Sequence, residues 1–270
     1  MQATEPTDGT APASATGQVV LSLRDIKKSF GGVEALQGAS LDVVGGKVTA
    51  LVGDNGAGKS TLIKTVMGVH QPTSGSIWID GNQKTIADPE TARNLGIEAI
   101  YQDLALVGTF DLVSNFFLGH ELTKSYLGGL ITVLDKNAMR QQAMKVLTEQ
   151  VGIHIGNPYA SAFVMSGGQR QAVAIGRAIH SDARLIIMDE PTAALGVEET
   201  ERVLTIIERL REQGLTVLVI SHNLEHVFRC ADYIAVMHRG QVTAVLQTSE
   251  VSREDVVAHI MGSQLTSKRL

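Results

Sequence analysis

The sequence predicts an α/β domain with a mostly parallel core sheet, a small antiparallel β part and an inserted helical subdomain. Short apolar runs of strand length alternate with amphipathic helical patterns along most of the chain. One run, Val48–Val52, is almost entirely apolar and lies between glycines, which is typical of a strand buried on both faces. Strand patterns vanish from about residue 103 to residue 164, where helical patterns predominate.

These patterns also predict the order of the elements. Strands are expected at residues 19–23, 40–44, 48–52, 76–79, 98–101, 185–188, 215–220, 233–237 and 241–246. Helices are expected after Gly58, at residues 89–95, after the capping residue Asp135, and at residues 170–179, 197–213 and 253–261. Asp80 and Gly81 predict a tight turn after the strand at 76–79.

The domain organisation is expected to be one unit at residues 19–265, with the helical subdomain at about 103–164, because no internal repeat is present. Residues 1–18 are rich in Thr, Ala, Pro and Ser, without a basic start or an apolar run, so we expect a flexible tail and no signal peptide. Residues 266–270 are expected to form a second short tail. No segment has the ~18 uninterrupted apolar residues that a membrane span needs. We therefore expect a soluble chain that reaches a membrane only through a partner.

The amino-acid composition favours a globular protein and disfavours a nucleic-acid binder. The chain has 23 Lys and Arg against 28 Asp and Glu, a net charge of −5, so it lacks the basic surplus typical of nucleic-acid binders and we expect no nucleic-acid partner. A hydrophobic content of 44% is enough for a packed core. The single cysteine, Cys230, cannot form an internal disulfide and is expected to be a small, partly buried side chain.

A glycine-rich loop follows the buried strand and precedes a helix. It matches the pattern GxxxxGK[ST] and consists of Gly53, Asp54, Asn55, Gly56, Ala57, Gly58, Lys59, Ser60 and Thr61. Glycines let successive backbone N–H groups point at a phosphate, and the positive end of the following helix faces the same place. Lys59 is expected to reach the β- and γ-phosphates, and the Ser60 hydroxyl is expected to ligate Mg²⁺. The loop therefore predicts a P-loop NTPase.

Two acidic residues end the apolar strand expected at 185–188. Asp189 at the strand tip suits a Mg²⁺ contact, usually through water. Glu190 beside it suits a base that orients and deprotonates an attacking water. An acidic strand end alone is commonly just solvated, and the P-loop upstream favours the functional interpretation.

A second anion site is indicated by Ser166, Gly167, Gly168 and Gln169, which begin a helical run. Serine is a good helix cap, and paired glycines leave backbone N–H groups exposed at a helix start. Taken alone, this tetrapeptide fits an ordinary capped helix equally well.

The three motifs, in this order and spacing, resemble the ATP-binding cassette (ABC) family, and the resemblance covers about residues 19–265. It implies ATP and Mg²⁺ as cofactors and hydrolysis of ATP to ADP and phosphate. It also implies that two copies pair head to tail. Each ATP then lies between the P-loop of one copy and the helix start at Ser166 of the other.

The resemblance assigns roles to three further residues. Phe30 stands where an aromatic ring stacks on adenine, Gln102 where a glutamine contacts Mg²⁺ or water and senses the γ-phosphate, and His222 where a switch histidine contacts the γ-phosphate. Core packing remains the alternative for Phe30, and a surface amide for Gln102. His226, four residues after His222, suggests a metal pair, but no third ligand is evident.

Two positions depart from the family pattern: Met165 replaces the first leucine of the signature, and Gly196 replaces an aspartate that helps couple the two sites. Residues 101–106 and 191–197 resemble the monosaccharide-importer branch, in which two such domains are commonly fused. This chain contains one.

The resemblance therefore implies the ATPase subunit of a sugar importer, peripheral at the cytoplasmic face of the inner membrane. It would act as a homodimer beneath two membrane permease subunits, with a separate solute-binding protein delivering the sugar. The choice of sugar would lie with those partners. The alternatives are the ATPase of an ABC exporter, a soluble ABC protein that acts on ribosomes or DNA, and a P-loop kinase of small molecules.

Overall fold

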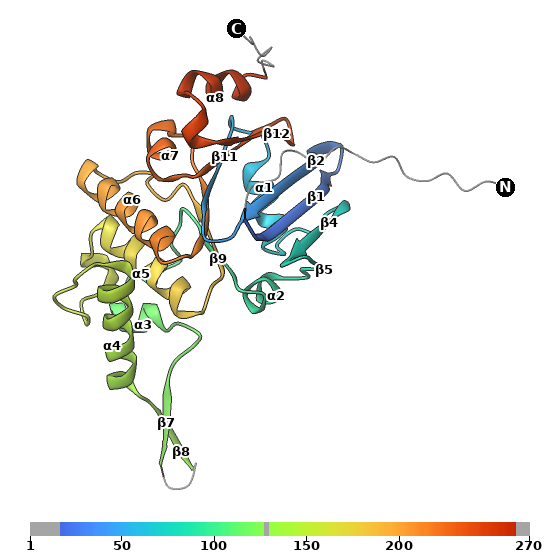
Figure 1. Cartoon of the computed structure of the whole chain (residues 1–270). Coiled ribbons are helices and arrows are strands. Elements are labelled where there is room, and N and C mark those ends of the chain that lie inside the picture. The colour runs from blue at the N-terminus through green and yellow to red at the C-terminus, as the bar shows by residue number, and fades with distance from the viewer. Residues whose placement is uncertain (1–16, 127–129, 263–270) are drawn as a thin grey trace.

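A computed structural model describes residues 17–126 and 130–262 (Figure 1). Its centre is a six-stranded sheet in the order β12-β11-β3-β10-β9-β6. All neighbours in this sheet are parallel except β12, which pairs antiparallel with β11. The strands are β3 (Val48–Val52), β6 (Ile97–Ile100), β9 (Leu185–Asp189), β10 (Thr216–Ile220), β11 (Tyr233–His238) and β12 (Gln241–Gln247). The predicted mostly parallel core sheet is confirmed.

The central strands are buried on both faces because alternate residues enter two different cores. Ala50 and Val219 belong to the core beneath the helices that cover one face of the sheet. Leu51 and Leu218 belong to the core on the other face, shared with the first helix and the antiparallel strands. This two-sided burial explains why these strands have no polar face in the sequence.

The antiparallel part has the strand order β2-β1-β4-β5. Its strands are β1 (Val19–Phe30), β2 (Val33–Val44), β4 (Ser74–Ile79) and β5 (Asn82–Lys84). β1 continues well beyond the expected residue 23, and an irregularity in its pairing near Asp25, whose φ is 48°, separates the predicted part from the rest. The predicted turn at Asp80 and Gly81 is confirmed, since both residues have positive φ and join β4 to β5.

Eight α-helices are present in the described part of the chain. They are α1 (Lys59–Val66), α2 (Pro89–Asn94), α3 (Leu112–Phe116), α4 (Lys136–Lys145), α5 (Gly167–His180), α6 (Val197–Glu212), α7 (Leu224–Cys230) and α8 (Arg253–Ile260). The predicted cap of α4 is confirmed, because the Asp135 carboxylate accepts a hydrogen bond from the N–H of Ala138 at 3.1 Å. A π-helical segment, Val146–Val151, then extends α4.

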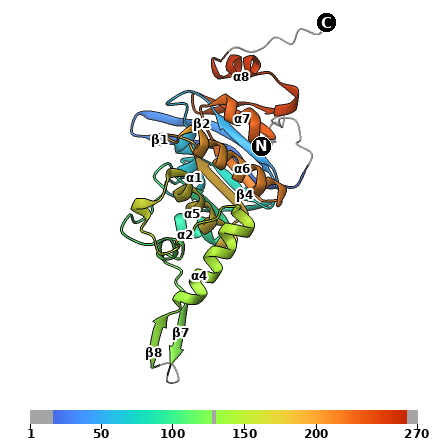
Figure 2. The ribbon, with the colours of Figure 1, turned by 90° about the vertical axis from the view of Figure 1, so that its left-hand side faces the viewer.

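The insertion between β6 and β9 contains α3, α4 and α5, but it is not purely helical. A hairpin of β7 (Thr123–Tyr126) and β8 (Ile131–Leu134) projects away from the body of the molecule in both ribbon views (Figures 1 and 2). The prediction that strands vanish from this region was therefore wrong. All eight strand residues are exposed, so burial imposes no strong alternation of apolar and polar residues for the sequence to reveal.

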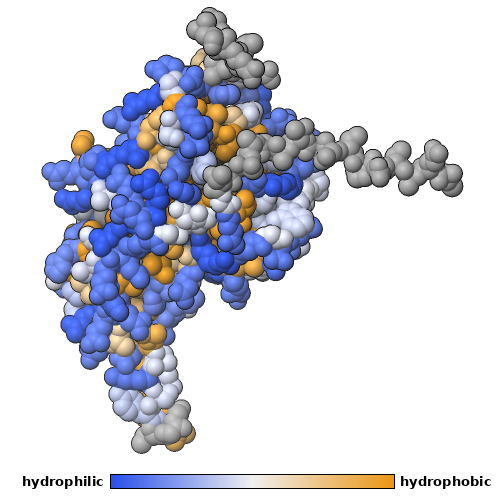
Figure 3. All heavy atoms as spheres, viewed as in Figure 1, coloured by the Kyte–Doolittle hydropathy of each residue, from blue (hydrophilic) through white to orange (hydrophobic). Residues whose placement is uncertain are grey.

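Hydrophilic residues cover much of the face of the molecule seen in Figure 3. Among the described helices, none has the length and apolar character needed to cross a bilayer. Cys230 is 1% exposed, more buried than expected, and burial raises the pKa of its thiol to about 12. The tails predicted at residues 1–18 and 266–270 lie, except for residues 17 and 18, outside the described residues.

The segment that joins the sheet to the inserted helices is held by one buried amide. Asn115, on α3, is 1% exposed. Its side-chain oxygen accepts from the N–H of Val107 at 2.7 Å, and its NH₂ group donates to the carbonyls of Val107, Phe110 and Asp111 at 3.0 to 3.2 Å. Because a buried side-chain amide needs partners, and these partners are backbone groups of one short segment, the side chain fixes the conformation of residues 107–111.

We predict that Asn115→Ala lowers the free energy of unfolding by about 1–3 kcal/mol, because it leaves the Val107 N–H without its hydrogen-bond partner and removes a buried side chain. Urea unfolding followed by circular dichroism would measure the change. Asn137→Ala, at an exposed position on α4, is the matched control and should change stability by less than about 0.5 kcal/mol. Equal stability of the two variants would contradict the proposed role of Asn115 in fixing residues 107–111.

Candidate functional site

The glycine-rich loop packs so closely on its neighbours that two of its glycines have no substitute. Gly53 has φ 149°, and a Cβ there would lie 2.1 Å from the Met237 carbonyl oxygen. Gly58 has φ 105°, and its Cβ would lie 2.7 Å from the Ala35 carbonyl oxygen. The loop therefore packs closely between β11 and β2, and these contacts hold its backbone in one conformation.

The start of α1 is open toward the cleft beside it. Its N-cap, Gly58, has no side chain to accept from the first N–H groups of the helix, so these donors are available to an anion. Lys59 is 9% exposed, and its Nζ donates to the carbonyls of Gly53 at 2.7 Å and Asp54 at 3.0 Å. Burial lowers the pKa of Lys59, while the nearby carboxylates of Glu190 and Asp189 oppose this shift.

A cleft of about 520 Å³ brings most of the predicted residues together. From the predicted set, it is lined by Asn55, Gly56, Gly58, Lys59, Ser60, Thr61, Gln102, Asp189, Glu190 and His222. Gly53, Asp54 and Ala57 do not line it, and the first two instead present their carbonyls to Lys59. Segments separated by more than 150 residues in the sequence thus share one cavity.

The two acids at the tip of β9 differ in environment. Burial raises the pKa of Asp189, the charge of Glu190 adds to this shift, and Lys59 opposes it. Glu190 has φ 50°, and its Oε1 lies 2.8 Å from Nδ1 of His222. The carboxylate can only accept in its ionised form, so Nδ1 of His222 carries the hydrogen in this contact.

Three oxygen-bearing side chains in the cleft fit a magnesium ion. The Ser60 hydroxyl, the Gln102 amide and the Asp189 carboxylate all line the same cavity, and Mg²⁺ prefers oxygen ligands. The raised pKa of Asp189 reflects a carboxylate that is partly removed from water, and a cation would stabilise its charged form.

Phe30 lies at the end of β1, where it pairs with the cleft residue Val33, but it does not itself line the cleft. Its side chain is 44% exposed, which excludes the alternative of core packing. The His70 ring meets it edge-on at a centroid distance of 5.0 Å, and Lys28 Nζ lies 5.0 Å from its centroid. The Phe30 ring is therefore a partly exposed aromatic group with a histidine and a lysine beside it.

The predicted second anion site lies elsewhere in the chain. Ser166 caps α5 reciprocally with Gln169: the Gln169 N–H donates to the Ser166 hydroxyl at 3.3 Å, and the Ser166 N–H donates to the Gln169 side chain at 3.0 Å. Neither these two residues nor Gly167 and Gly168 line the cleft. Within one chain, the two predicted phosphate sites are therefore separate.

Glu199 is a residue of this region that sequence reasoning missed. Its Oε2 lies 3.3 Å from the position that a Cβ on Gly167 would occupy, and it accepts from the N–H of Gly196 at 3.4 Å. Hydrogen bonding from the Ser166 side chain and then from Gly196 lowers its pKa. Its position three residues after Gly196, as in a capping box, was the available sequence signal.

The chain matches the ABC transporter family over residues 36–193. It is 42% identical over 237 residues to a xylose/arabinose import ATP-binding protein of Sulfolobus acidocaldarius, covering 88% of this chain and 92% of that protein. It is 40% identical over 246 residues to a fructose import ATP-binding protein of Rhizobium meliloti, covering 91% and 95%. A ribose import ATP-binding protein of Yersinia pestis is 36% identical over 92% of this chain, which spans 47% of that protein.

Solved structures agree with these sequence relatives. The ATP-binding cassette of an ABC transporter, in its ADP conformation, superposes with a TM-score of 0.75 at 27% identity, covering 90% of this chain and 95% of that one. A nucleotide-free ATP-binding cassette gives the same values.

The fold and the cleft together define a P-loop NTPase: a parallel sheet, a phosphate-binding loop after one buried strand, and two acids at the tip of another. Within that class, the chain belongs to the ABC transporter family and is an ATP-hydrolysing cassette.

We predict that Lys59→Ala weakens ATP binding by about 10- to 100-fold, because it removes a charged donor from the phosphate site. Isothermal titration calorimetry with Mg²⁺ present would measure the affinity. Lys64→Ala, at an exposed position on the same helix, should keep the wild-type affinity. Equal affinities of the Lys59→Ala variant and the wild type would remove the proposed role of the lysine.

Proposed function

We propose that this chain is the ATPase subunit of an ABC importer for a monosaccharide, peripheral at the cytoplasmic face of the inner membrane. The observation that carries the catalytic part is the cleft that joins the phosphate loop, the two strand-tip acids and the 2.8 Å contact between Glu190 and His222. The names of the relatives, importers of xylose/arabinose, fructose and ribose, support the sugar and the direction of transport over the exporter and ribosome alternatives.

The proposal gives a role to the main groups in and beside the cleft. The N–H groups at the start of α1 and the Lys59 ammonium bind the phosphates of ATP, and Phe30 stacks on adenine. Glu190 orients a water molecule and accepts its proton as the oxygen attacks the γ-phosphorus, and ADP leaves. His222 and Gln102 contact the γ-phosphate side of the cleft. Mg²⁺ held by Ser60, Gln102 and Asp189 would neutralise phosphate charge.

The separation of the two anion sites supports a homodimer. The helix start at Ser166 presents glycine N–H groups but does not reach the cleft of its own chain. A second copy arranged head to tail would place its Ser166 opposite the first copy's phosphate loop, so that each nucleotide contacts both copies. Closure of the dimer then completes the site.

An exposed apolar surface is the proposed contact with the membrane permease subunits. It consists of Phe110, Tyr159, Phe163 and Val164, whose exposed fractions are 42 to 75%. The Ala162 N–H donates to the Phe110 carbonyl at 2.9 Å, so the two contributing segments lie side by side. Asn115 fixes the first of them, which begins five residues after Gln102 in the sequence. A permease bound here would sense the nucleotide cleft, and a solute-binding protein would act through the permease.

We predict that Glu190→Gln slows ATP hydrolysis by about 100-fold or more while ATP affinity is retained, because the amide keeps the shape but cannot accept the proton. Phosphate release and calorimetry would measure the two quantities. Glu198→Gln, exposed on α6, is the control and should match the wild type. Cells lacking the gene should regain growth on one monosaccharide with the wild-type chain and not with Glu190→Gln. Near-wild-type turnover by Glu190→Gln would contradict the proposed base.

A mixing experiment tests the shared sites. Ser166→Arg should abolish hydrolysis but leave ATP binding to the monomer intact, since the bulky side chain blocks dimer closure and not nucleotide entry. In a mixed dimer of Ser166→Arg and Lys59→Ala, both lesions fall on one nucleotide site and the other site stays intact. Activity or ATP trapping should therefore return on mixing. A mixture with neither hydrolysis nor ATP-dependent dimerisation would contradict head-to-tail pairing.

A further inference from the structure

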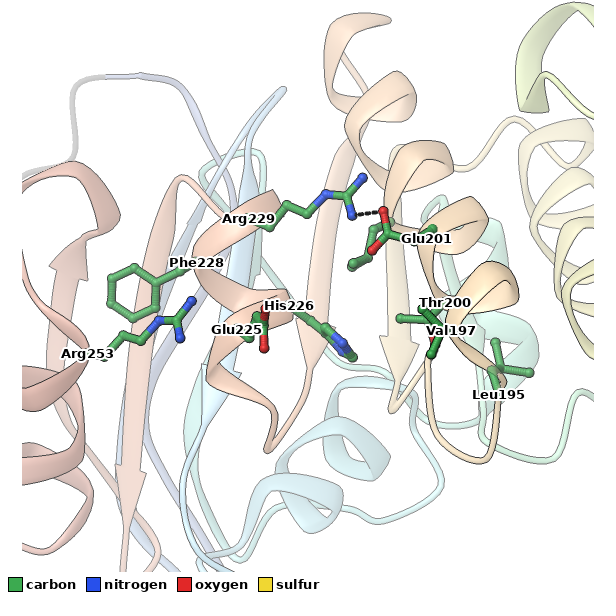
Figure 4. Close-up of a pocket in the computed structure, with 10 residues that line it drawn as sticks. Leu195, Val197, Thr200, Glu201, Glu225, His226, Phe228, Arg229 and Arg253 are labelled. Atoms are coloured by element: carbon green, nitrogen blue, oxygen red, sulfur yellow. Dashed lines mark hydrogen bonds and ion pairs between the residues drawn. The ribbon is translucent and has the colours of Figure 1, made fainter.

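His226 connects two loops of the catalytic region without entering the nucleotide cleft. It extends from α7 toward the loop that precedes α6, and it lines a groove of about 530 Å³ between these elements (Figure 4). Its Nδ1 lies 3.0 Å from the Thr192 hydroxyl, and its Nε2 lies 3.3 Å from the side-chain nitrogen of Asn223. Both ring nitrogens therefore have a partner, and these partners belong to different loops.

The cap of α7 determines which ring nitrogen carries the hydrogen. The Asn223 side-chain oxygen accepts from the N–H of Glu225 at 2.9 Å and of His226 at 3.4 Å. The NH₂ group of Asn223 must therefore face the ring, and Nε2 must accept from it. The hydrogen of the neutral ring then lies on Nδ1 and is donated to the Thr192 hydroxyl.

The contact between His226 and Thr192 joins the same two loops as the contact between His222 and Glu190. Thr192 follows Glu190 by two residues, and His226 follows His222 by four. The same two loops are also joined by the Glu190 N–H, which donates to the Ile220 carbonyl at 2.9 Å. Glu190 occupies the left-handed backbone region, with φ 50°, which costs energy for a non-glycine residue and persists only when the surroundings hold it.

We propose that His226 is a positioning residue, which holds Glu190 against His222 by tying Thr192 to the start of α7. The inference rests on the proposed function, in which Glu190 activates the attacking water. None of Thr192, Asn223 and His226 lines the nucleotide cleft. Loss of the hydrogen bond between His226 and Thr192 should therefore slow hydrolysis without weakening ATP binding.

A purely structural role for His226 makes a different prediction, and Arg229 is the matched control for it. Arg229 also lies on α7, but it ties this helix to α6, through ion pairs with Glu201 and with Glu208, the latter at 3.1 Å. It contacts neither catalytic loop in these pairs. If anchoring of α7 were all that mattered, Arg229→Ala would reduce turnover as much as His226→Ala.

The experiment measures kcat, ATP affinity and the unfolding temperature of the purified full chain. His226→Ala and Thr192→Val should each lower kcat about tenfold and change ATP affinity by less than about twofold. The double variant should be no slower than either single variant, because both remove the same bond. His226→Asn places an amide donor where Nδ1 stands and should recover most of the rate. Arg229→Ala should lower the unfolding temperature and keep kcat.

Nitrogen-15 spectra of the wild-type chain supply a second readout, and His226 should carry its hydrogen on Nδ1. The proposal is overturned by a kcat for His226→Ala close to the wild type, by an equal loss in Arg229→Ala, or by hydrogen on Nε2. Glu190→Gln measured alongside separates the two levels. If it keeps full turnover, the proposed function fails; if it is inactive while His226→Ala is fully active, only the positioning role fails.

Discussion

The parallel hydrogen bonding of β10 between β3 and β9 is the constraint on which the site depends. In this register Ile220 lies opposite both Leu51 and Asp189, so the carboxyl ends of the three strands coincide. The phosphate loop, the acidic pair and the His222 loop leave the sheet at this same edge. A shift of one residue in either pairing would turn the buried side chains to the opposite face and separate these loops.

Two oppositely charged groups, Lys59 and Asp189, are partly buried at this edge of the sheet, and neither fully compensates the burial of the other. Burial lowers the pKa of Lys59 and raises that of Asp189, and each shift is reduced by the other group. Lys59 nevertheless donates to the carbonyls of Gly53 and Asp54, and it forms no ion pair with any residue that the structure describes. A bound phosphate and a cation would supply the charges that both groups lack, which explains why the cleft is partly desolvated yet polar.

Side-chain contacts also hold the segments and loops that surround the cleft. Asn115 fixes the segment that follows Gln102, and that segment carries part of the exposed apolar surface. Thr192 and His226 join the loops that hold Glu190 and His222. The segment fixed by Asn115 lies, in the sequence, between the cleft residue Gln102 and α3.

The sequence by itself determined what local spacing encodes. The loop from Gly53 to Thr61 needs its glycines at fixed intervals, and the strand that ends at Asp189 is apolar because both its faces are buried, so both features were predictable. The same holds for the caps at Asp135 and Ser166, which act over three residues. These features depend on backbone geometry and burial within short segments.

Only the tertiary structure decided what depends on contacts between distant segments. The β7–β8 hairpin was missed because its exposed strands bear no burial pattern. Exposure of Phe30 and the bond of His226 to Thr192 each required the positions of separate elements. The same is true of the distance between the Ser166 helix start and the cleft, which no spacing in the sequence contains. Side-chain partners far apart in the chain are chosen by the packing of the sheet and its helices, and local sequence preferences carry no record of that choice.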